Sequence, residues 1–259
     1  MEGAKRFISL TAFSTHVFCA SLKQGSQQFL YCFDNIDEMN HQFNTSSFED
    51  DFDHGFFYQD SSNSVRVRWK NRAGEIQLCG SGAFALNCYL QSKIKNQCWW
   101  MSNDFFKIKG DWQSGKATIS LPSSAPSTVK PDLWYHHQTG IYFQKVSNLE
   151  SLKSHLILKD FLKQNHQQPH GYCAFYWNSE KKRGTLRYFC PWHGRNEDSV
   201  TGSIQRHLNP LIQNLTGQKE QKWTQLSHNG GQLTTRSTEE GTQLSGDWTP
   251  FNPEIFPFS

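Results

Sequence analysis

Two stretches of this chain decide its fold: Glu75-Ile76-Gln77-Leu78-Cys79-Gly80-Ser81 and Glu197-Asp198-Ser199-Val200-Thr201-Gly202-Ser203. Both have the form E-x-x-x-x-G-S, and both precede an apolar run with helical character. The similarity continues upstream, because Val67-Arg68-Trp69 precedes the first stretch and Leu186-Arg187-Tyr188 precedes the second. Sequence features that recur in the same order indicate a repeated structural unit. We therefore predict two similar half-domains that face one site.

A third pair of similar tripeptides lies further upstream, His54-Gly55-Phe56 in one half and His170-Gly171-Tyr172 in the other. The spacings differ between the halves by a few residues, as insertions in loops would produce. We predict half-domains at residues 1–122 and 123–259, joined by the Pro/Ser-rich segment 122–131. The tail, residues 246–259, is expected either to pack back on the first half or to fray.

Regular structure is expected throughout both halves. Strands are predicted at residues 7–13, 28–33, 65–69, 105–108, 117–121, 140–146, 172–177, 185–189, 231–236 and 242–248. From Ser81 a helix of about ten residues is apolar around most of its circumference, which is typical of a helix buried on all sides. Further helices are expected at 149–162 and from Ser203, where Pro210 would sit uncomfortably inside the helix.

The composition limits the class of protein. With 259 residues and a dispersed net charge of +3, the chain suits one large domain or two small ones and disfavours a nucleic-acid-binding surface. The basic cluster 181–183 is interpreted as a hairpin turn, with a phosphate-binding patch as the alternative. Seven irregularly spaced cysteines favour free thiols in a reducing compartment. No apolar stretch approaches the roughly 20 residues of a spanning helix, so we expect a cytoplasmic protein without membrane contact.

The paired Gly-Ser turns suggest how a ligand is held. Gly80-Ser81 and Gly202-Ser203 each place unpaired backbone N–H groups and the positive end of a helix dipole at one point. If the two helices meet head to head, the space between them suits a small anion. The alternative is a tight turn with an N-cap serine in each half.

One longer segment resembles a known family. Residues 187–203, from Arg187-Tyr188-Phe189 to Val200-Thr201-Gly202-Ser203, are similar to the R-Y-F-x-P-x-x-G-x-x-E-D-x-V-T-G-S signature of the PhzF-like phenazine-biosynthesis isomerases. Residues 78–83 are similar to that family's L-C-G-H-A-T segment, and to the C-G-N-G-A segment of diaminopimelate epimerases.

The resemblance implies the diaminopimelate epimerase-like fold, an α+β architecture of two pseudo-symmetric half-domains. In this fold a curved, mostly antiparallel sheet wraps around a central apolar helix in each half, and the site lies between the halves. The resemblance also implies a cofactor-independent isomerase or epimerase that moves a proton at a carbon of a small carboxylate-bearing substrate. No metal is required, and homodimers are common in the family.

Carried over by position, Asp198 matches the family's functional aspartate, and Gly202 and Ser203 match its substrate-binding turn. The counterpart of the catalytic glutamate lies at Asp53 or His54. Asp53 could act through a side chain shorter by one methylene, and His54 through a pKa near neutrality.

The remaining candidates depart from the family pattern. Ser81 replaces the family histidine, and Cys79 and Thr201 stand where the epimerases carry two cysteines, so a two-thiol racemase is not expected. Cys79 is interpreted chiefly as a buried structural thiol. The predicted substrate-binding set is Cys79, Gly80, Ser81, Gly82, Thr201, Gly202 and Ser203. The alternative function is a catalytically reduced member that binds a small acid or a protein partner without turnover.

Overall fold

The computed structural model describes residues 11–21, 24–193 except 155–169, and 195–254. The first half runs β1 (Thr11–Val17), β2 (Ser26–Phe33), α1 (Ile36–Thr45), β3 (Asp53–Ser61), β4 (Ser64–Asn71), β5 (Gly74–Ile76), α2 (Gly80–Lys93), β6 (Trp99–Ser102), β7 (Lys107–Gln113) and β8 (Lys116–Leu121). The second repeats this order as β10 (Leu133–His136), β11 (Ile141–Lys145), α3 (Leu149–Ser154), β12 (Gly171–Asn178), β13 (Arg183–Cys190), β14 (Arg195–Glu197), α5 (Gln205–Thr216), β15 (Glu220–Gln225), β16 (Gly231–Thr238) and β17 (Gly241–Ser245). The further elements are β9 (Ser127–Lys130), the 3-10 turn η1 (Pro191–His193) and β18 (Asn252–Glu254).

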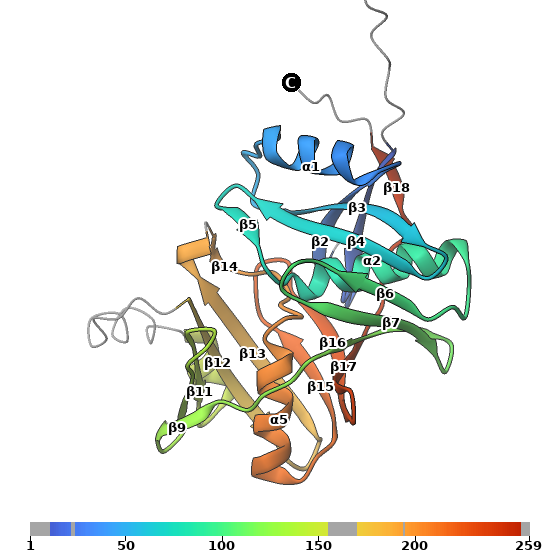
Figure 1. Ribbon diagram of the computed structural model, residues 1–259. Coiled ribbons are helices and arrows are strands. Elements are labelled where there is room, and N and C mark those ends of the chain that lie inside the picture. Colours follow the sequence, from blue (N-terminus) through green and yellow to red (C-terminus); the bar gives the residue numbers. More distant parts are fainter. Residues whose placement is uncertain (1–10, 22–23, 155–169, 194, 255–259) are drawn as a thin grey trace, which may run out of the picture.

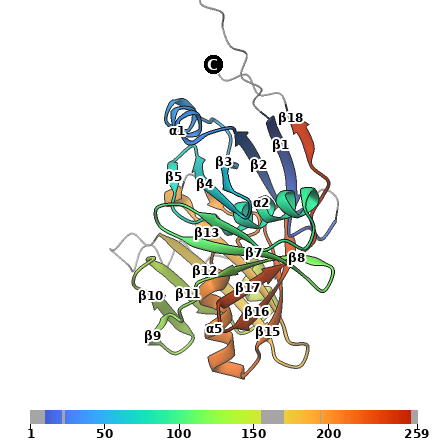
Figure 2. The ribbon, with the colours of Figure 1, turned by 45° about the vertical axis from the view of Figure 1, so that its right-hand side comes forward.

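Strand pairing repeats as well. In each half the second strand pairs in parallel with the third, β2 with β3 and β11 with β12, and the remaining neighbours are mostly antiparallel. The two sheets join where β8 pairs with β17, and β18 at the end of the chain pairs with β1 of the first half. Figures 1 and 2 show the two curved layers, one above the other. The predicted fold, two pseudo-symmetric halves with curved sheets, is confirmed.

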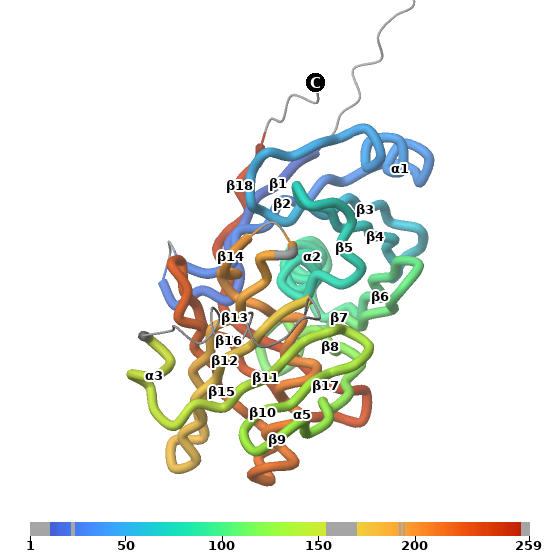
Figure 3. Tube along the Cα trace, turned by 90° about the vertical axis from the view of Figure 1, so that its left-hand side faces the viewer, coloured from blue at the N-terminus to red at the C-terminus, as the bar shows by residue number. Residues whose placement is uncertain are grey.

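The central helix of the first half, α2, is buried nearly all round, as its sequence predicts. Figure 3 views it almost end-on, inside the strands of its half. It has 14 residues rather than about ten, because it begins one residue earlier, at Gly80, and continues to Lys93. The sulfur of Cys79 caps it by accepting a hydrogen bond from the backbone N–H of Gly82 at 3.2 Å.

The central helix of the second half, α5, begins at Gln205, two residues after the predicted start at Ser203. Pro210 lies inside it and lacks the N–H that would bond the carbonyl of Arg206. Ser124, in the segment between the halves, donates its backbone N–H to that carbonyl at 3.1 Å instead. The N–H of Ser124 therefore replaces the hydrogen bond that Pro210 cannot make.

The glutamates of the repeated signature have one role in both halves. Glu75 on β5 receives two hydrogen bonds from Arg68 on β4, each 3.0 Å long. Glu197 on β14 receives two from Arg187 on β13, each 2.8 Å long. Such bidentate pairs fix the two strands at a defined angle. They explain why an arginine and a glutamate recur together in the sequence.

One predicted correspondence is wrong. Gly55 lies opposite Trp69, whereas Cys173 lies opposite Tyr188, so the counterpart of His54-Gly55-Phe56 is Tyr172-Cys173-Ala174 and not His170-Gly171-Tyr172. The two tripeptides have similar sequences, but His170 lies two residues before the true counterpart of His54. A shift of two residues keeps each side chain on the same face of the strand, so the pattern of burial is unchanged. In this register the residue equivalent to Asp53 is Gly171.

Other boundaries differ in smaller ways. The predicted linker 122–131 contains β9, and the strand predicted at 105–108 is observed at Lys107–Gln113 (β7). The predicted strand 7–13 and helix 149–162 lie partly outside the described residues. The basic cluster 181–183 lies at the hairpin of β12 and β13, as predicted. In the described part, the seven cysteines are free thiols and no helix is long and apolar enough to cross a membrane.

The starts of the two central helices touch through their glycines, and a substitution there tests the contact. A Cβ added to Gly80 would lie 2.4 Å from the backbone nitrogen of Ser203, and one added to Gly202 would lie 2.9 Å from the carbonyl carbon of Gly80. Both neighbours are backbone atoms that cannot rotate away. We expect Gly80→Ala to lower the free energy of unfolding, measured in urea, by about 3 kcal/mol or more.

Gly115→Ala is the matched control. Gly115 has open space around its Cα but a φ of +81°. The backbone strain alone should cost about 1–2 kcal/mol. A Gly80→Ala variant no less stable than Gly115→Ala would contradict the close approach of the two helix starts.

Candidate functional site

One arginine joins carboxylates from the two halves. Arg195, on β14, donates from Nη2 to Oδ1 of Asp53 at 2.6 Å and from Nη1 to Oδ1 of Asp198 at 2.8 Å. The side chains of Arg195, Asp53 and Asp198 are only 14%, 12% and 13% exposed. Burial opposes the charge on Arg195, but the two carboxylates outweigh it and raise the pKa of the guanidinium. The site therefore contains a fixed cation between two carboxylates.

Asp53 is placed by its strand and by a thiol. It begins β3, and its Oδ2 receives a hydrogen bond from Sγ of Cys79 at 3.2 Å. Burial, followed by the nearby charge of Asp53, raises the pKa of Cys79 well above its ordinary value. Cys79 is therefore a neutral thiol that caps α2 and donates to Asp53, rather than a thiolate base.

Asp198 is held in a similar way in the second half. The hydroxyl of Thr201 donates to its Oδ2 at 2.7 Å, and the backbone N–H of Ser199 donates to its Oδ1 at 3.0 Å. Gln225, on β15, locks the turn by donating to the carbonyl of Asp198 at 2.7 Å and accepting from the N–H of Thr201 at 2.9 Å. Thr201 thus occupies the position of Cys79, and each supports one of the two aspartates.

His54, the other candidate base, faces the opposite side of β3 from Asp53, as adjacent strand residues do. It is fully buried, with Nδ1 2.9 Å from Oη of Tyr31 and Nε2 2.9 Å from Oδ1 of Asp50. Its ring stacks on Phe48 with 3.5 Å between the ring centroids. Burial lowers the pKa of His54, although Asp50 opposes the shift. Its contacts are those of a core histidine.

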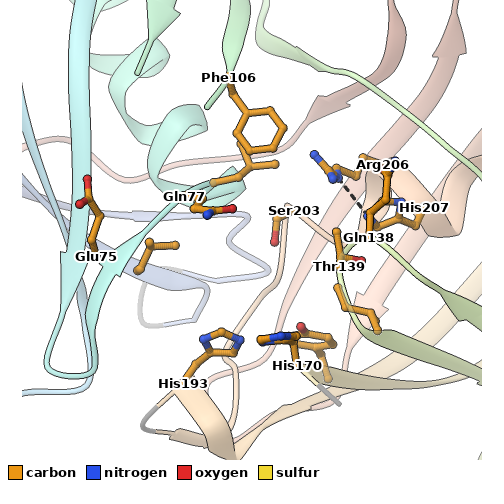
Figure 4. A pocket seen from close by; sticks show the side chains of 14 residues that line it. Glu75, Gln77, Phe106, Gln138, Thr139, His170, His193, Ser203, Arg206 and His207 are labelled. Atoms are coloured by element: carbon orange, nitrogen blue, oxygen red, sulfur yellow. Dashed lines mark hydrogen bonds between the residues drawn. The ribbon is translucent and has the colours of Figure 1, made fainter. Parts of the chain in front are cut away.

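A cleft between the halves opens beside these groups. Its narrow part, about 150 Å³, is lined by Asp53, Asn71, Ile76, Leu78, Tyr188, Cys190, His193, Arg195 and Asp198. Its wide part, about 490 Å³, shares Ile76, Leu78, Tyr188 and His193 with the narrow part and is also lined by Glu75, Gln77, Phe106, Gln138, Thr139, Ile141, His170, Ser203, Arg206 and His207. Figure 4 shows the wide part, with Ser203 between Gln77 and Arg206.

The structure separates the predicted site residues into two groups. Asp53, Asp198 and Ser203 line the cleft, whereas Cys79, Gly80, Ser81, Gly82, Thr201 and Gly202 are buried behind its wall. The sequence reasoning missed Arg195, which occupies a free position of the family signature, and its only signal was a charge close to Asp198. Among the described residues, no group of three or more His, Cys, Asp or Glu side chains could hold a metal ion.

The far wall of the wide part is a chain of hydrogen bonds. Arg206 donates from Nε to Nε2 of His207 at 2.9 Å, and Nδ1 of His207 lies 2.8 Å from the carbonyl oxygen of Ser124. His207 can accept at Nε2 and donate at Nδ1 only as the neutral tautomer. Burial lowers the pKa of His207 to about 3, although the carbonyl of Ser124 opposes the shift.

Comparisons with known proteins agree with this architecture. A phenazine biosynthesis-like domain-containing protein from Homo sapiens is 27% identical over 210 residues, 66% of this chain and 70% of that protein. Its namesake from Bos taurus is 40% identical over 55 residues, 21% of this chain and 19% of that protein. No family model matches the chain.

Solved structures share the fold. A PhzC/PhzF protein from Clostridium difficile superposes with a TM-score of 0.75 at 16% identity and covers 96% of this chain and 100% of its own. A PhzF family protein from Enterococcus faecalis gives 0.74 at 16%, with 95% and 100% covered. A probable proline racemase from Agrobacterium radiobacter, crystallised with carbonate, gives 0.59 at 9%, with 97% and 94% covered. The resemblance predicted from the sequence is confirmed.

Removal of the Arg195 guanidinium should destabilise the protein, because two buried carboxylates lose their counter-charge. We expect Arg195→Met to lower the free energy of unfolding at pH 7 by about 3 kcal/mol or more, because Asp53 and Asp198 lose their shared cation. Arg66→Met, which breaks an exposed pair with Asp104, should cost less than about 1 kcal/mol.

Asp53→Asn combined with Arg195→Met should be less harmful than the sum of the single changes, since one repelling charge is then absent. Urea unfolding of the four proteins gives the coupling energy. Strict additivity would show that the guanidinium and Asp53 do not interact.

The buried histidine at the far wall predicts a pH dependence. A group whose folded pKa is lowered takes up its proton more readily when unfolded, so its contribution to stability is present above about pH 6.5 and is lost as the pH falls. Between pH 7.5 and 5.5, His207→Asn should lose about 1.4 kcal/mol less stability than the original protein.

Asn can still donate to the carbonyl of Ser124, which limits structural damage. The control is the interval from pH 7.5 to 8.5, where the two proteins should change in parallel. Equal losses on acidification would show that His207 takes up a proton in the folded state as well.

Proposed function

Because the chain is PhzF-like in sequence and in fold, we propose that it is a cofactor-independent isomerase or epimerase that moves a proton at a carbon of a small carboxylate-bearing metabolite. One observation carries the proposal. Asp53 and Asp198 come from different halves of a duplicated chain and are brought to two nitrogens of one guanidinium at the wall of a narrow cleft. Two largely buried carboxylates beside a cleft suit general acid–base chemistry.

Asp53 is the proposed base. One oxygen is held by Arg195 and the other by the Cys79 thiol, so the carboxylate is held in one position before the substrate binds. In the proposed step Asp53 takes the proton from the substrate carbon, and the electron pair of the broken C–H bond moves toward the substrate's own carboxylate. Protonated Asp53 then returns the proton to a carbon of the substrate. Asp198 is the candidate for a second acid, a role that requires it to take up a proton from solvent before the substrate binds; Asp53 then keeps the proton that it removed.

The substrate carboxylate is proposed to lie by the Gly202-Ser203 turn. Ser203 lines the wide part of the cleft, next to the meeting point of the two central helices. Negative charge that develops on the substrate would be favoured there by the N-terminal ends of the two central helices. Ser81 stands behind the wall and would act only indirectly.

A second candidate, binding without turnover, is favoured by the same ion pair. Both oxygens of Asp53 are engaged, and the family's glutamate and histidine are replaced by Asp53 and Ser81. A protein of this kind would bind a small acid in the cleft and leave its C–H bonds intact.

Exchange of hydrogen for deuterium separates the two candidates. Purified protein in D2O would be incubated with amino acids, hydroxy acids and dihydroaromatic amino acids, and loss of a C–H signal followed by proton NMR. We expect exchange with at least one compound, reduced by Asp53→Asn at least about 100-fold, since removal of a general base typically costs that much.

Asp51→Asn is the control, because Asp51 is an exposed carboxylate two residues away that pairs with Arg72. It should exchange at the original rate. Absence of exchange with every compound, combined with ligand-induced thermal stabilisation by one of them, would favour binding without turnover.

A further inference from the structure

The wide part of the cleft contains a buried cation without an anionic partner. Arg206 is 9% exposed and lines the cavity of about 490 Å³. Within the described residues, none of the ion pairs includes it. Burial lowers the pKa of Arg206, with no carboxylate opposing the shift, yet a guanidinium stays charged at neutral pH. An uncompensated buried charge is costly, which indicates a role other than stability.

The guanidinium of Arg206 is held in a fixed orientation through its Nε atom. Nε donates to His207, which is itself fixed by Ser124, and Cζ lies 5.0 Å from the centroid of the Phe106 ring. Ser124 also donates to the carbonyl of Arg206, the group freed by Pro210. In the described part of the chain these bonds leave Nη1 and Nη2 unpaired. Two parallel N–H donors on a rigid fork match a carboxylate or a phosphate.

Among the described residues that line this cavity, no carboxylate is free to bind these two nitrogens. Glu75 lines the same cavity but is bound on both oxygens by Arg68. Gln138 and Thr139 supply neutral polar groups around Arg206, as Figure 4 shows. The volume lies within the range of small-ligand sites. The wall therefore favours an anionic group with hydrogen-bonding neighbours.

We propose that Arg206 binds a second anionic group of the substrate, a carboxylate or a phosphate, so that the preferred substrates are diacids. This inference rests on the proposed function, in which the first carboxylate lies by the Gly202-Ser203 turn and the reacting carbon beside Asp53. The narrow and wide parts share a wall at Tyr188 and His193, so one elongated molecule can reach both. Asp53 then acts on the end of the substrate in the narrow part, and Arg206 binds the second anionic group in the wide part.

Binding by matched acids tests the inference without turnover. The probes are L-glutamate, L-2-aminoadipate and O-phospho-L-serine, each against its counterpart without the second charge: L-norvaline, L-norleucine and L-serine. Isothermal titration of the full-length protein should show at least one diacid bound at least about tenfold more tightly than its counterpart, as charge-assisted hydrogen bonds predict. The carboxylate and phosphate probes distinguish the two kinds of second group.

Arg206→Gln should abolish this preference and leave the affinity for the monoacids unchanged, whereas Arg206→Lys should retain part of it. Arg183→Gln, at an exposed arginine, is matched in net charge and should keep the full preference. The melting temperature of unliganded Arg206→Gln should be no lower than that of the original protein, since the change removes an unpaired buried charge.

Three results would overturn the inference: equal binding of diacids and monoacids, failure of every diacid to bind at millimolar concentration, or a preference that survives Arg206→Gln. The outcome is separable from that of the proposed function. Deuterium exchange in monoacids without any preference for diacids would leave the isomerase standing and remove the second anion site. A preference that depends on Arg206, without exchange in any compound, would leave the anion site and remove the isomerase.

Discussion

The close contact between Gly80 and Gly202 sets the distance between the two halves at the cleft. With no side chain at either position, the start of α2 and the turn that precedes α5 meet backbone to backbone. This approach brings Asp53, on the first half, within reach of Arg195 and Asp198, on the second. A separation larger by one methyl group would open the ion pairs, because a guanidinium that bridges two carboxylates tolerates little change in distance. The positions of the charged groups in the cleft thus depend on the packing of Gly80 against Gly202 behind its wall.

The two halves share the residues that hold the strands together but differ in the chemical groups that line the cleft. The bidentate arginine–glutamate pairs are the same in both halves, and the two central helices are held by equivalent turns. The chemical groups differ: the position of Asp53 is Gly171 in the second half, and Cys79 is matched by Thr201. A Cβ at Gly171 would lie 2.1 Å from the hydroxyl oxygen of Tyr188, so a side chain there would force Tyr188 to move. The symmetric scaffold therefore surrounds an asymmetric cleft, with different groups on its two walls.

The fold could be predicted from the sequence because the strongest sequence signals are local. The turn glycines, the apolar helix from Ser81 and the duplicated signature each reflect a short-range requirement of the backbone or the core. The two aspartates of the site also followed from motif positions. Arg195 and Arg206 could not be found in this way, because their roles depend on which distant groups fold against them. The pairing of His54 with His170 failed for a related reason, since similarity of letters does not fix strand register.

The pairing of β18 with β1 has a consequence for how the molecule assembles. Strand β1 lies between β2 and β18, and β18 comes from the last part of the chain. During synthesis, the outer edge of β1 therefore emerges long before the strand that covers it. The first half leaves the ribosome with an open sheet edge, and this edge is protected only when the second half has been made and residues 252–254 have crossed over. The sheet of the first half is thus completed only after all the strands of the second half have been made.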